Sequence, residues 1–234
     1  MIALIDSDII AYRVSFACKD ESIVAARQTV NSYIADILMC GVDNCFSGCF
    51  VDDWKLYLTG KNNFRNKIAT TAVYKGNRTA EKPKHLAAIR EYIVSEFAAI
   101  VVDGQEADDA IAIDATIHGD NCVIVSVDKD LDQLSGWHYN FVKRHNYYVN
   151  PNDALLNFYK QILTGDSADN IIGLSGIGKV RAEKILSECK TEQELYDACV
   201  AAYDGNVDRV IENARLLWLR RYENQMWEPP WKQT

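Results

Sequence analysis

Four groups of carboxylates constrain what this chain can fold into, because three of the groups follow short apolar runs. The runs are "IALI" before Asp6, "AAIVV" shortly before Glu106 and "VIVSV" before Asp128. Such runs are typical of buried parallel strands, and the carboxyl ends of strands in an open α/β sheet face one crevice. Acids far apart in the sequence are therefore expected to meet there. The nine acids are Asp6, Asp8, Glu106, Asp108, Asp109, Asp128, Asp130, Asp166 and Asp169.

The crowding of these acids predicts bound cations. A single aspartate after a strand is more often a helix cap or turn residue, because its side chain satisfies free backbone N–H groups. Repetition of the pattern in four groups favours metal binding instead. Hard oxygen ligands suit magnesium or manganese, and two such ions about 4 Å apart are a common apparatus for hydrolysing phosphodiesters. We therefore expect two magnesium or manganese ions.

Composition narrows the class of protein. The chain has 234 residues, 48% of them hydrophobic, which is enough for one sizeable core. It contains no apolar stretch of the roughly 20 residues that a membrane span needs, and "MIALIDSDII" lacks the pattern of a signal peptide. We expect a monomer that remains in the cytoplasm and does not bind membranes. None of the seven cysteines forms a C-x-x-C pair, which favours reduced thiols over structural zinc.

The net charge of −8 is unevenly distributed. Between Lys55 and Arg90 nine bases face a single acid, whereas the rest of the chain has 16 bases and 32 acids. Aromatic residues interleave the basic segment, a composition that suits phosphate binding combined with base stacking. We predict nucleic-acid contacts from this segment by Lys61, Arg65, Tyr74, Lys82 and Lys84.

Alternating strand and helix patterns predict a parallel sheet with helices on its faces. The expected strands are residues 2–5, 55–59, 98–102 and 122–127; the expected helices are 22–40, 84–97 and 107–118. A hairpin over 139–149 turns at "RHN", and "NPND" at 150–153 caps the first of several helices. The prediction is an α/β domain over 1–150, which includes the basic segment 61–84 with its short helical stretch, and a helical module over 151–234.

A second motif lies in "GDSADNIIGLSGIGKVRAEKIL", from Gly165 to Leu186. Asp166 and Asp169 are three residues apart, which would place them on one face of a helical turn. Gly176 and Gly178 precede a basic helix, where backbone N–H groups can approach a phosphate closely. Lys179 and Arg181 add positive charge, so all four residues are predicted DNA contacts. The spacing is not the G-x-G-x-x-G of dinucleotide sites. A helical hairpin with glycine caps is the alternative.

Together these motifs resemble the flap endonuclease and 5′-nuclease family, which includes compact phage enzymes and the 5′-nuclease domain of bacterial DNA polymerase I. The matching pieces are "LIDSD" at 4–8, "FR" at 64–65, "YKGNR" at 74–78, "EADDAIA" at 106–112, "SVDKD" at 126–130 and "GDSADNIIGLSGIG" at 165–178. The resemblance covers nearly the whole chain. It implies a PIN-like α/β core, a helix-three-turn-helix module, and divalent-metal-dependent cleavage near a free 5′ end.

The resemblance also implies roles for individual residues. Lys75 and Arg78 match the basic pair that contacts the scissile phosphate, and the segment 61–84 stands where the family has an arch over a single-stranded 5′ tail. Metal ligands fall into two sets. The residues that match first-metal ligands are Asp6, Glu106, Asp108 and Asp109, and those that match the acids around the second metal are Asp128, Asp130, Asp166 and Asp169.

The implied function is 5′ to 3′ exonuclease or flap endonuclease activity in replication, in the host cytoplasm if the chain is phage-encoded. The implied partners are DNA with a free 5′ end or flap, an RNA primer in an RNA–DNA duplex, and a replication polymerase. Two alternatives stay open. One is a flap or junction binder with little hydrolysis, and the other is a primer-removing or PIN-type ribonuclease.

One departure from the family pattern concerns the end of the second strand. Family members usually carry an aspartate there, whereas this chain has Leu58, Thr59 and Gly60. We expect Asp8 to replace that acid in part, with Asp52 and Asp53 as alternatives that a solvated turn disfavours. The first metal site is expected to bind magnesium weakly because it has fewer carboxylates.

Overall fold

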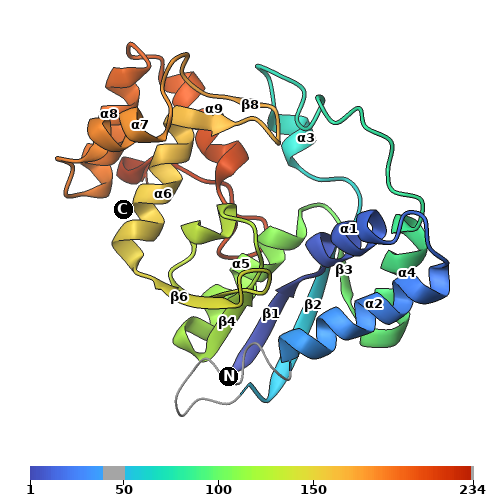
Figure 1. Ribbon diagram of the computed structural model, residues 1–234. Helices are drawn as coiled ribbons and strands as arrows, with labels where there is room; N and C mark the ends of the chain where they lie inside the picture. Colours follow the sequence, from blue (N-terminus) through green and yellow to red (C-terminus); the bar gives the residue numbers. More distant parts are fainter. Residues whose placement is uncertain (39–50, 233–234) are drawn as a thin grey trace.

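The computed structural model describes residues 1–38 and 51–232 and has an α/β fold (Figure 1). A six-stranded sheet forms its centre, with the order β3-β2-β1-β4-β5-β6. Neighbouring strands are parallel except for β5 and β6, which form an antiparallel hairpin. The strands are β1 (Ile2–Asp6), β2 (Asp53–Thr59), β3 (Ile100–Val102), β4 (Cys122–Val125), β5 (Gly136–Asn140) and β6 (His145–Val149). The predicted mostly parallel sheet is confirmed.

Helices cover both faces of the sheet. They are α1 (Ser7–Ala17), α2 (Ile23–Asp36), α4 (Leu86–Phe97) and α5 (Ala107–His118). Ile5 and Val125 pack in a cluster with α1, α2 and α4, whereas Leu4 and Ile124 pack in a cluster with α5. Successive side chains of a strand point to opposite faces, so a sheet covered on both faces requires continuous apolar runs.

Helix α1 is absent from the elements predicted above. It follows β1 without a loop, and Asp6 is its N-cap, whose carboxylate accepts from the backbone N–H of Ile9 at 3.4 Å. Asp8 lies in its first turn. Both features are ordinary signals of a helix start. The prediction omitted this helix because it interpreted both aspartates as metal ligands at the end of a strand.

The turns also differ in detail from the prediction. The predicted hairpin is present but spans 136–149, and its turn at 141–144 includes only Arg144 of "RHN". The placement of Asp166 and Asp169 on one helical turn is wrong. They lie in a second hairpin made of β7 (Gly165–Asp166) and β8 (Ile171–Ile172). Gly165, at φ 67°, ends the preceding helix, because few residues other than glycine adopt that backbone conformation.

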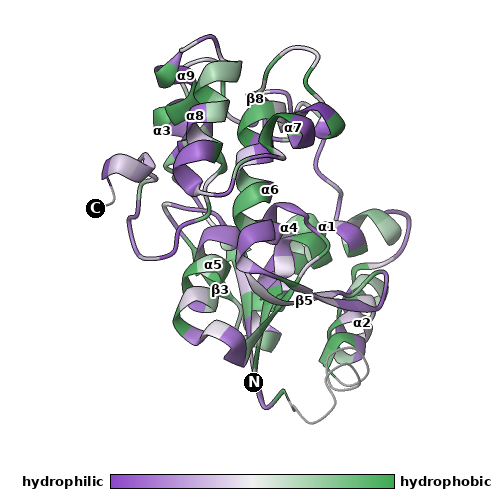
Figure 2. Ribbon diagram, turned by 90° about the vertical axis from the view of Figure 1, so that its left-hand side faces the viewer, coloured by the Kyte–Doolittle hydropathy of each residue, from purple (hydrophilic) through white to green (hydrophobic). Residues whose placement is uncertain are grey.

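A second core holds the helical module together. Its helices are α6 (Pro151–Thr164), α7 (Lys179–Leu186), α8 (Glu192–Ala202) and α9 (Val207–Leu217). Phe158 of α6 is fully buried and packs against Trp218 and Trp227 near the end of the chain. The central strands are largely hydrophobic (Figure 2), and α6 buries Phe158, Ile162 and Leu163 on its apolar side. This core also contains Tyr74 from the basic segment, so the segment packs against the module.

The four cysteines within the described residues are free thiols, as predicted; Cys40, Cys45 and Cys49 lie outside them. Residues 39 and 40 of the predicted helix 22–40 also lie outside. In the described part of the chain, no helix combines the length and the apolar character needed to cross a membrane.

Candidate active site

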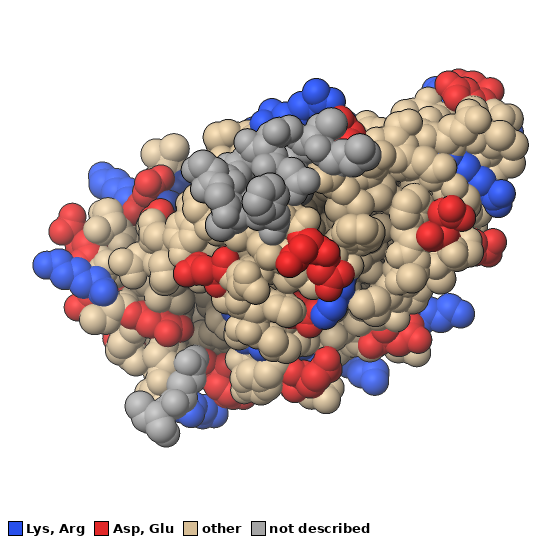
Figure 3. Space-filling model, turned by 90° about the horizontal axis from the view of Figure 1, so that it is seen from below, with Lys and Arg blue, Asp and Glu red and all other residues tan. Residues whose placement is uncertain are grey.

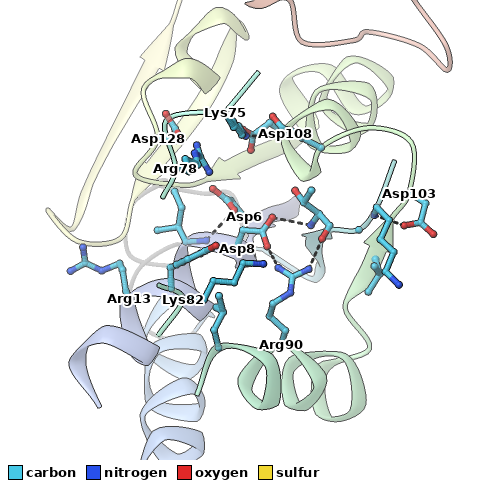
Figure 4. Close-up of a pocket in the computed structure, with 18 residues that line it drawn as sticks. Asp6, Asp8, Arg13, Lys75, Arg78, Lys82, Arg90, Asp103, Asp108 and Asp128 are labelled. Atoms are coloured by element: carbon cyan, nitrogen blue, oxygen red, sulfur yellow. Dashed lines mark hydrogen bonds and ion pairs between the residues drawn. The ribbon is translucent and has the colours of Figure 1, made fainter. Parts of the chain in front are cut away.

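A pocket of about 870 Å³ opens at the carboxyl ends of β1, β2 and β4 (Figure 4). Strand β1 lies between β2 and β4, which makes this edge the switch point of the sheet, where α/β folds place their ligands. Acidic and basic side chains line it in equal number. They are Asp6, Asp8, Asp103, Glu106, Asp108 and Asp128, and Arg13, Lys61, Lys75, Arg78, Lys82 and Arg90.

Asp6 and Asp108 are the most strongly perturbed acids in the pocket. Asp6 is 2% exposed, and its carboxylate accepts from the hydroxyl of Ser126 at 2.9 Å. Burial, together with the nearby charge of Asp8, raises the pKa of Asp6 to about 7. Burial and the charges of neighbouring acids, above all Asp6, raise the pKa of Asp108 well above its ordinary value. Like charges held in a desolvated site favour either protons or cations.

A second group of acids joins β4 to the β7–β8 hairpin. Burial, followed by the charges of Asp128 and Asp166, raises the pKa of Asp130 to about 8. Asp130 also accepts from the side-chain amide of Gln161 on α6 at 2.5 Å. Burial raises the pKa of Asp128, and the charges of Asp166 and Asp169 add to that increase. The predicted grouping of these four acids in space is therefore what the structure shows, although their role as ligands stays a prediction.

Lys75 and Arg78 reach the acids from the side opposite Arg90 (Figure 4). The ammonium of Lys75 forms an ion pair with Glu106 and lies 3.5 Å from Asp169. Arg78 donates to the other oxygen of Asp169 at 2.7 Å. The two bases predicted to contact the phosphate therefore stand among the predicted metal ligands.

Tyr74 has a different role from the predicted base stacking. Its side chain is 6% exposed and lies in the core of the helical module. Its hydroxyl is 2.6 Å from a carboxylate oxygen of Asp169 and 3.0 Å from one of Glu106, so it can donate to either. Burial raises the pKa of Tyr74, which keeps the phenol protonated as a donor. The residue fixes the acids and cannot stack on a base.

Arg65 and Asp109 form a buried ion pair, which corrects two predictions. Arg65 is 2% exposed and donates to both carboxylate oxygens of Asp109, at 2.5 and 2.9 Å. Asp109 is fully buried and also accepts from the backbone N–H groups of Glu106 and Arg220. With both oxygens occupied, Asp109 cannot bind a metal in this geometry. Arg65 is equally unable to reach DNA, because it lies beneath the surface.

The carboxylate of Asp8 is bonded to protein groups outside the cluster of acids. One oxygen accepts from the backbone N–H of Thr59 at 2.8 Å, and the other pairs with the guanidinium of Arg90. Arg90 also donates to the carbonyl of Thr59. These bonds satisfy the carboxylate, so the predicted metal role of Asp8 gains no support from its geometry. The prediction above assigns no role to Arg90, which looks in the sequence like one base of a basic run.

Asp103 is a further acid that the predictions above do not include. It directly follows β3, and its carboxylate accepts from the backbone N–H of Lys61 at 2.6 Å. A Cβ on Gly60 would collide with this carboxylate and would lie 2.7 Å from the carbonyl of Val102. The end of β2 therefore has no room for the side chain that the family pattern leads one to expect, and an acid from β3 lies there instead.

The remaining predicted DNA contacts are accessible. Lys61, Lys82 and Lys84 are exposed, and the first two line the pocket. Gly178 is the N-cap of α7, and no side chain caps that helix. Lys179 and Arg181 are exposed, although Arg181 donates to the carbonyl of Gly176 at 2.8 Å. By contrast, acidic and basic side chains are interspersed on the face seen from below (Figure 3).

The donor set fits a divalent ion by its chemistry. Carboxylate oxygens are the ligands that magnesium and manganese prefer. Burial, followed by repulsion from neighbouring acids, raises the pKa of Asp6, Asp108 and Asp130, and a bound cation would favour their ionised forms. Within residues 1–38 and 51–232, no three His, Cys, Asp or Glu side chains converge on one point as they stand. Ligation of one ion by three of these acids would need side-chain rearrangement, and Glu106 and Asp169 pair with Lys75 as they stand.

Comparison with known proteins supports the resemblance found in the sequence, although no protein-family model matches. The chain is 27% identical to the thermostable DNA polymerase I of Thermus caldophilus over 92% of its own length. It covers only 26% of that polymerase. It is 33% identical to a 5′-3′ exonuclease of Mycoplasmopsis pulmonis, over 41% of this chain and 36% of that protein.

Solved structures with the same fold include two proteins in complex with DNA. The flap endonuclease of bacteriophage T5, solved with DNA and metal ions, matches 94% of this chain and 90% of its own, with a TM-score of 0.69 and 20% identity. The catalytic core of Rad2 with a DNA substrate matches 84% of this chain and 64% of its own, with a TM-score of 0.52 and 15% identity. The chain is therefore similar in sequence to DNA polymerase I and to a 5′-3′ exonuclease, and it shares the fold of the T5 flap endonuclease.

Proposed function

We propose that this protein is a divalent-metal-dependent 5′-nuclease that hydrolyses phosphodiester bonds near the 5′ end of DNA. The observation that carries the proposal is the pocket in which Asp6, Glu106, Asp108 and Asp128 meet Lys75 at the switch point of the sheet. The names of its relatives, which include exonucleases and flap endonucleases, support the same reaction.

The acids of the pocket would hold the metal. We propose Asp6, Glu106 and Asp108 for one ion and Asp128, Asp130, Asp166 and Asp169 for a second, with magnesium or manganese as the ion. Bound divalent ions polarise a phosphodiester and lower the pKa of an attacking water. The structural neighbours are solved with divalent metal ions, which supports the cofactor class but neither its identity nor its number.

Lys75 and Arg78 would neutralise charge on the phosphoryl oxygens. Such preorganised donors are worth roughly 100- to 1000-fold in rate, so Lys75→Ala should slow single-turnover cleavage by about that factor. The exposed amino terminus of α7, with Lys179 and Arg181, would hold the duplex through its backbone. Contacts of this kind position a duplex without reading its sequence, so we expect recognition of structure.

The test is cleavage of a 5′-labelled flap substrate by the purified protein in magnesium, with a blunt duplex and an RNA-tailed flap beside it. We expect cutting at or near the junction of the DNA flap, and Asp128→Asn should abolish it while binding in calcium survives. Binding without cutting by the wild type would favour the junction-binder alternative. Cutting of free single-stranded RNA alone would favour a ribonuclease.

A further inference from the structure

The segment 70–78 carries Lys75 yet contains no helix or strand. Lys75 adopts the left-handed backbone conformation, at φ 54°, which a lysine rarely occupies without surrounding contacts that impose it. Its backbone N–H donates to the carbonyl of Asp169 at 2.8 Å, and the side-chain amide of Asn170 donates to the carbonyl of Val73 at 2.9 Å. These contacts fix the middle of the segment to the β7–β8 hairpin.

The beginning of the segment is fixed by a different element, helix α9. One carboxylate oxygen of Glu212 accepts from the backbone N–H groups of Thr70 and Thr71, at 2.6 and 2.7 Å. The other accepts from the hydroxyl of Thr71 at 2.6 Å and from Arg209 at 2.7 Å. The side chain of Glu212 is only 9% exposed. All of its acceptor capacity is therefore directed at this loop and at Arg209.

The same helix holds the hairpin that carries Asp169. Arg209 donates to the hydroxyl oxygen of Thr71 and, at 2.7 Å, to the carbonyl of Ile172 in β8. Asn213 donates to that carbonyl as well, at 2.9 Å. One turn of α9 therefore anchors both the segment that carries Lys75 and the hairpin that carries Asp169. Burial acts against ionisation of Glu212, but its bonds from Thr71 and Thr70 outweigh that effect and lower its pKa to about 2.

We propose that Glu212 is a positioning residue for Lys75. Glu212 holds residues 70 and 71 against α9. This contact fixes the path of the segment 70–78, so that the side chain of Lys75 reaches Glu106 and Asp169. The inference rests on the proposed nuclease function, in which Lys75 meets the phosphate. Glu212 itself lines neither the pocket nor the exposed end of α7. Its loss should therefore slow the cleavage step and leave duplex binding intact.

The experiment compares Glu212→Ala and Glu212→Gln with Asp208→Ala, an exposed acid on the same helix, in the full chain. A misplacement of about 1 Å can cost roughly 100-fold in rate, so we expect Glu212→Ala to slow single-turnover cleavage at least ~10-fold. The dissociation constant for flap DNA in calcium should change less than ~2-fold. Glu212→Gln keeps an acceptor for the two N–H groups and should restore part of the rate, and Asp208→Ala should match wild type.

Two further readouts separate positioning from general loss of structure. Hydrogen exchange at the amides of residues 70, 71 and 75 should accelerate in Glu212→Ala while α6 stays protected. The double variant with Lys75→Ala should cleave no more slowly than Lys75→Ala alone, because the two changes remove one interaction.

An unchanged cleavage rate in a folded Glu212→Ala protein whose loop amides exchange faster would overturn the proposal, as would additive effects in the double variant. Should Glu212→Ala fail to fold, Glu212→Gln carries the same comparisons. If the wild type does not cut DNA at all, the nuclease function fails. The anchoring of the segment 70–78 by Glu212 is then tested by hydrogen exchange alone. Unchanged protection of residues 70, 71 and 75 in Glu212→Ala would contradict it.

Discussion

At the scale of single residues, the buried pair of Arg65 and Asp109 shows how charge serves structure beside the candidate active site. Asp109 accepts from the backbone N–H of Glu106, with which it forms the capping box of α5. Arg65 also donates to the carbonyls of Leu216 and Trp218. The pair therefore joins the start of the basic segment to α5 and to the carboxyl-terminal part of the chain. It fixes the helix end that carries Glu106 and Asp108.

Replacement of Asp109 by asparagine should be strongly destabilising. Removal of one partner of a buried ion pair leaves an uncompensated charge and typically costs about 3–5 kcal/mol. The matched control is Asp36→Asn, because Asp36 pairs with Arg144 at the surface, where such pairs contribute ~1 kcal/mol or less. Urea unfolding of both variants checks the prediction. Equal losses in the two proteins would contradict it.

The same pair predicts a pH dependence of stability. Although burial opposes ionisation, the ion pair with Arg65 holds the pKa of Asp109 below its ordinary 3.8. A carboxylate with a lowered folded-state pKa stabilises the fold fully above its unfolded pKa and loses that contribution as the pH falls. The wild type should therefore lose stability below about pH 4 more steeply than Asp109→Asn. Parallel curves of unfolding free energy against pH would refute this assignment.

Gly60 gives a prediction about packing. Its N–H donates to the carbonyl of Val102 at 2.7 Å, so the backbone there cannot easily shift to admit a Cβ. Gly60→Ala should cost about 1–3 kcal/mol, the usual range for overpacking. Gly60→Asp should destabilise further and should not restore a metal ligand. Gly178→Ala is the control, because a Cβ there meets nothing within 4 Å, and its cost should be about 1 kcal/mol or less.

At the scale of elements, strands β1 to β4 could be predicted from sequence, whereas the β7–β8 hairpin and the contacts that join the elements could not. The runs before Asp6 and Asp128 belong to strands covered on both faces, a condition that leaves a clear apolar signal. Helix α1 could not be predicted because the two aspartates at its start suit a metal site as well as a helix start. The partnership of Arg65 with Asp109 spans 44 residues, and no local spacing indicates it. In the sequence, Arg65 is indistinguishable from the exposed bases around it.

Three elements meet at Asp8 and a fourth joins them through Thr59, which predicts a structural role for Asp8. Asp8 of α1 binds the backbone of Thr59 in β2 and pairs with Arg90 of α4. The hydroxyl oxygen of Thr59 accepts from the first residue of α5, Ala107, at 2.9 Å. Asp8→Ala should lower the unfolding free energy by about 1.5–3 kcal/mol, the range for hydrogen bonds to charged groups, even in EDTA.

The control for this prediction is Asp20→Ala, since Asp20 is highly exposed and pairs with Lys19 at 4.0 Å. A double-mutant cycle of Asp8→Ala with Arg90→Ala should show a coupling energy, because the two side chains touch. If Asp8→Ala were as stable as wild type in EDTA yet required more magnesium for cleavage, the metal role of Asp8 would be restored and the structural role rejected.

At the scale of the whole molecule, the charge distribution predicts salt-dependent binding. A protein of net charge −8 can hold DNA only through local basic surfaces, here the pocket wall and the start of α7. Each phosphate contact contributes about 0.9 to the slope of log K against log salt. Lys179→Ala and Arg181→Ala should each weaken duplex binding uniformly across sequences and reduce the slope by about 1. Titrations in increasing potassium chloride measure this.

Lys190→Ala is the matched control, because Lys190 is exposed in the same module but lies beyond the end of α7. Its slope should equal that of the wild type. If the α7 variants kept the full slope, the duplex would bind elsewhere, and the alternative of a glycine-capped hairpin with no DNA contact would be favoured.

The order of the sheet has a consequence for the solubility of the chain. Its edges are β3, which is only three residues long, and β6, which is five residues long and paired to its neighbour as a hairpin. Long unpaired edge strands recruit strands from other molecules, and natural proteins suppress this by keeping edges short. β3 therefore offers little backbone for intermolecular pairing despite the exposed side chains of Ile100 and Val101. Any extension of β3 by design would put the chain at risk of aggregation.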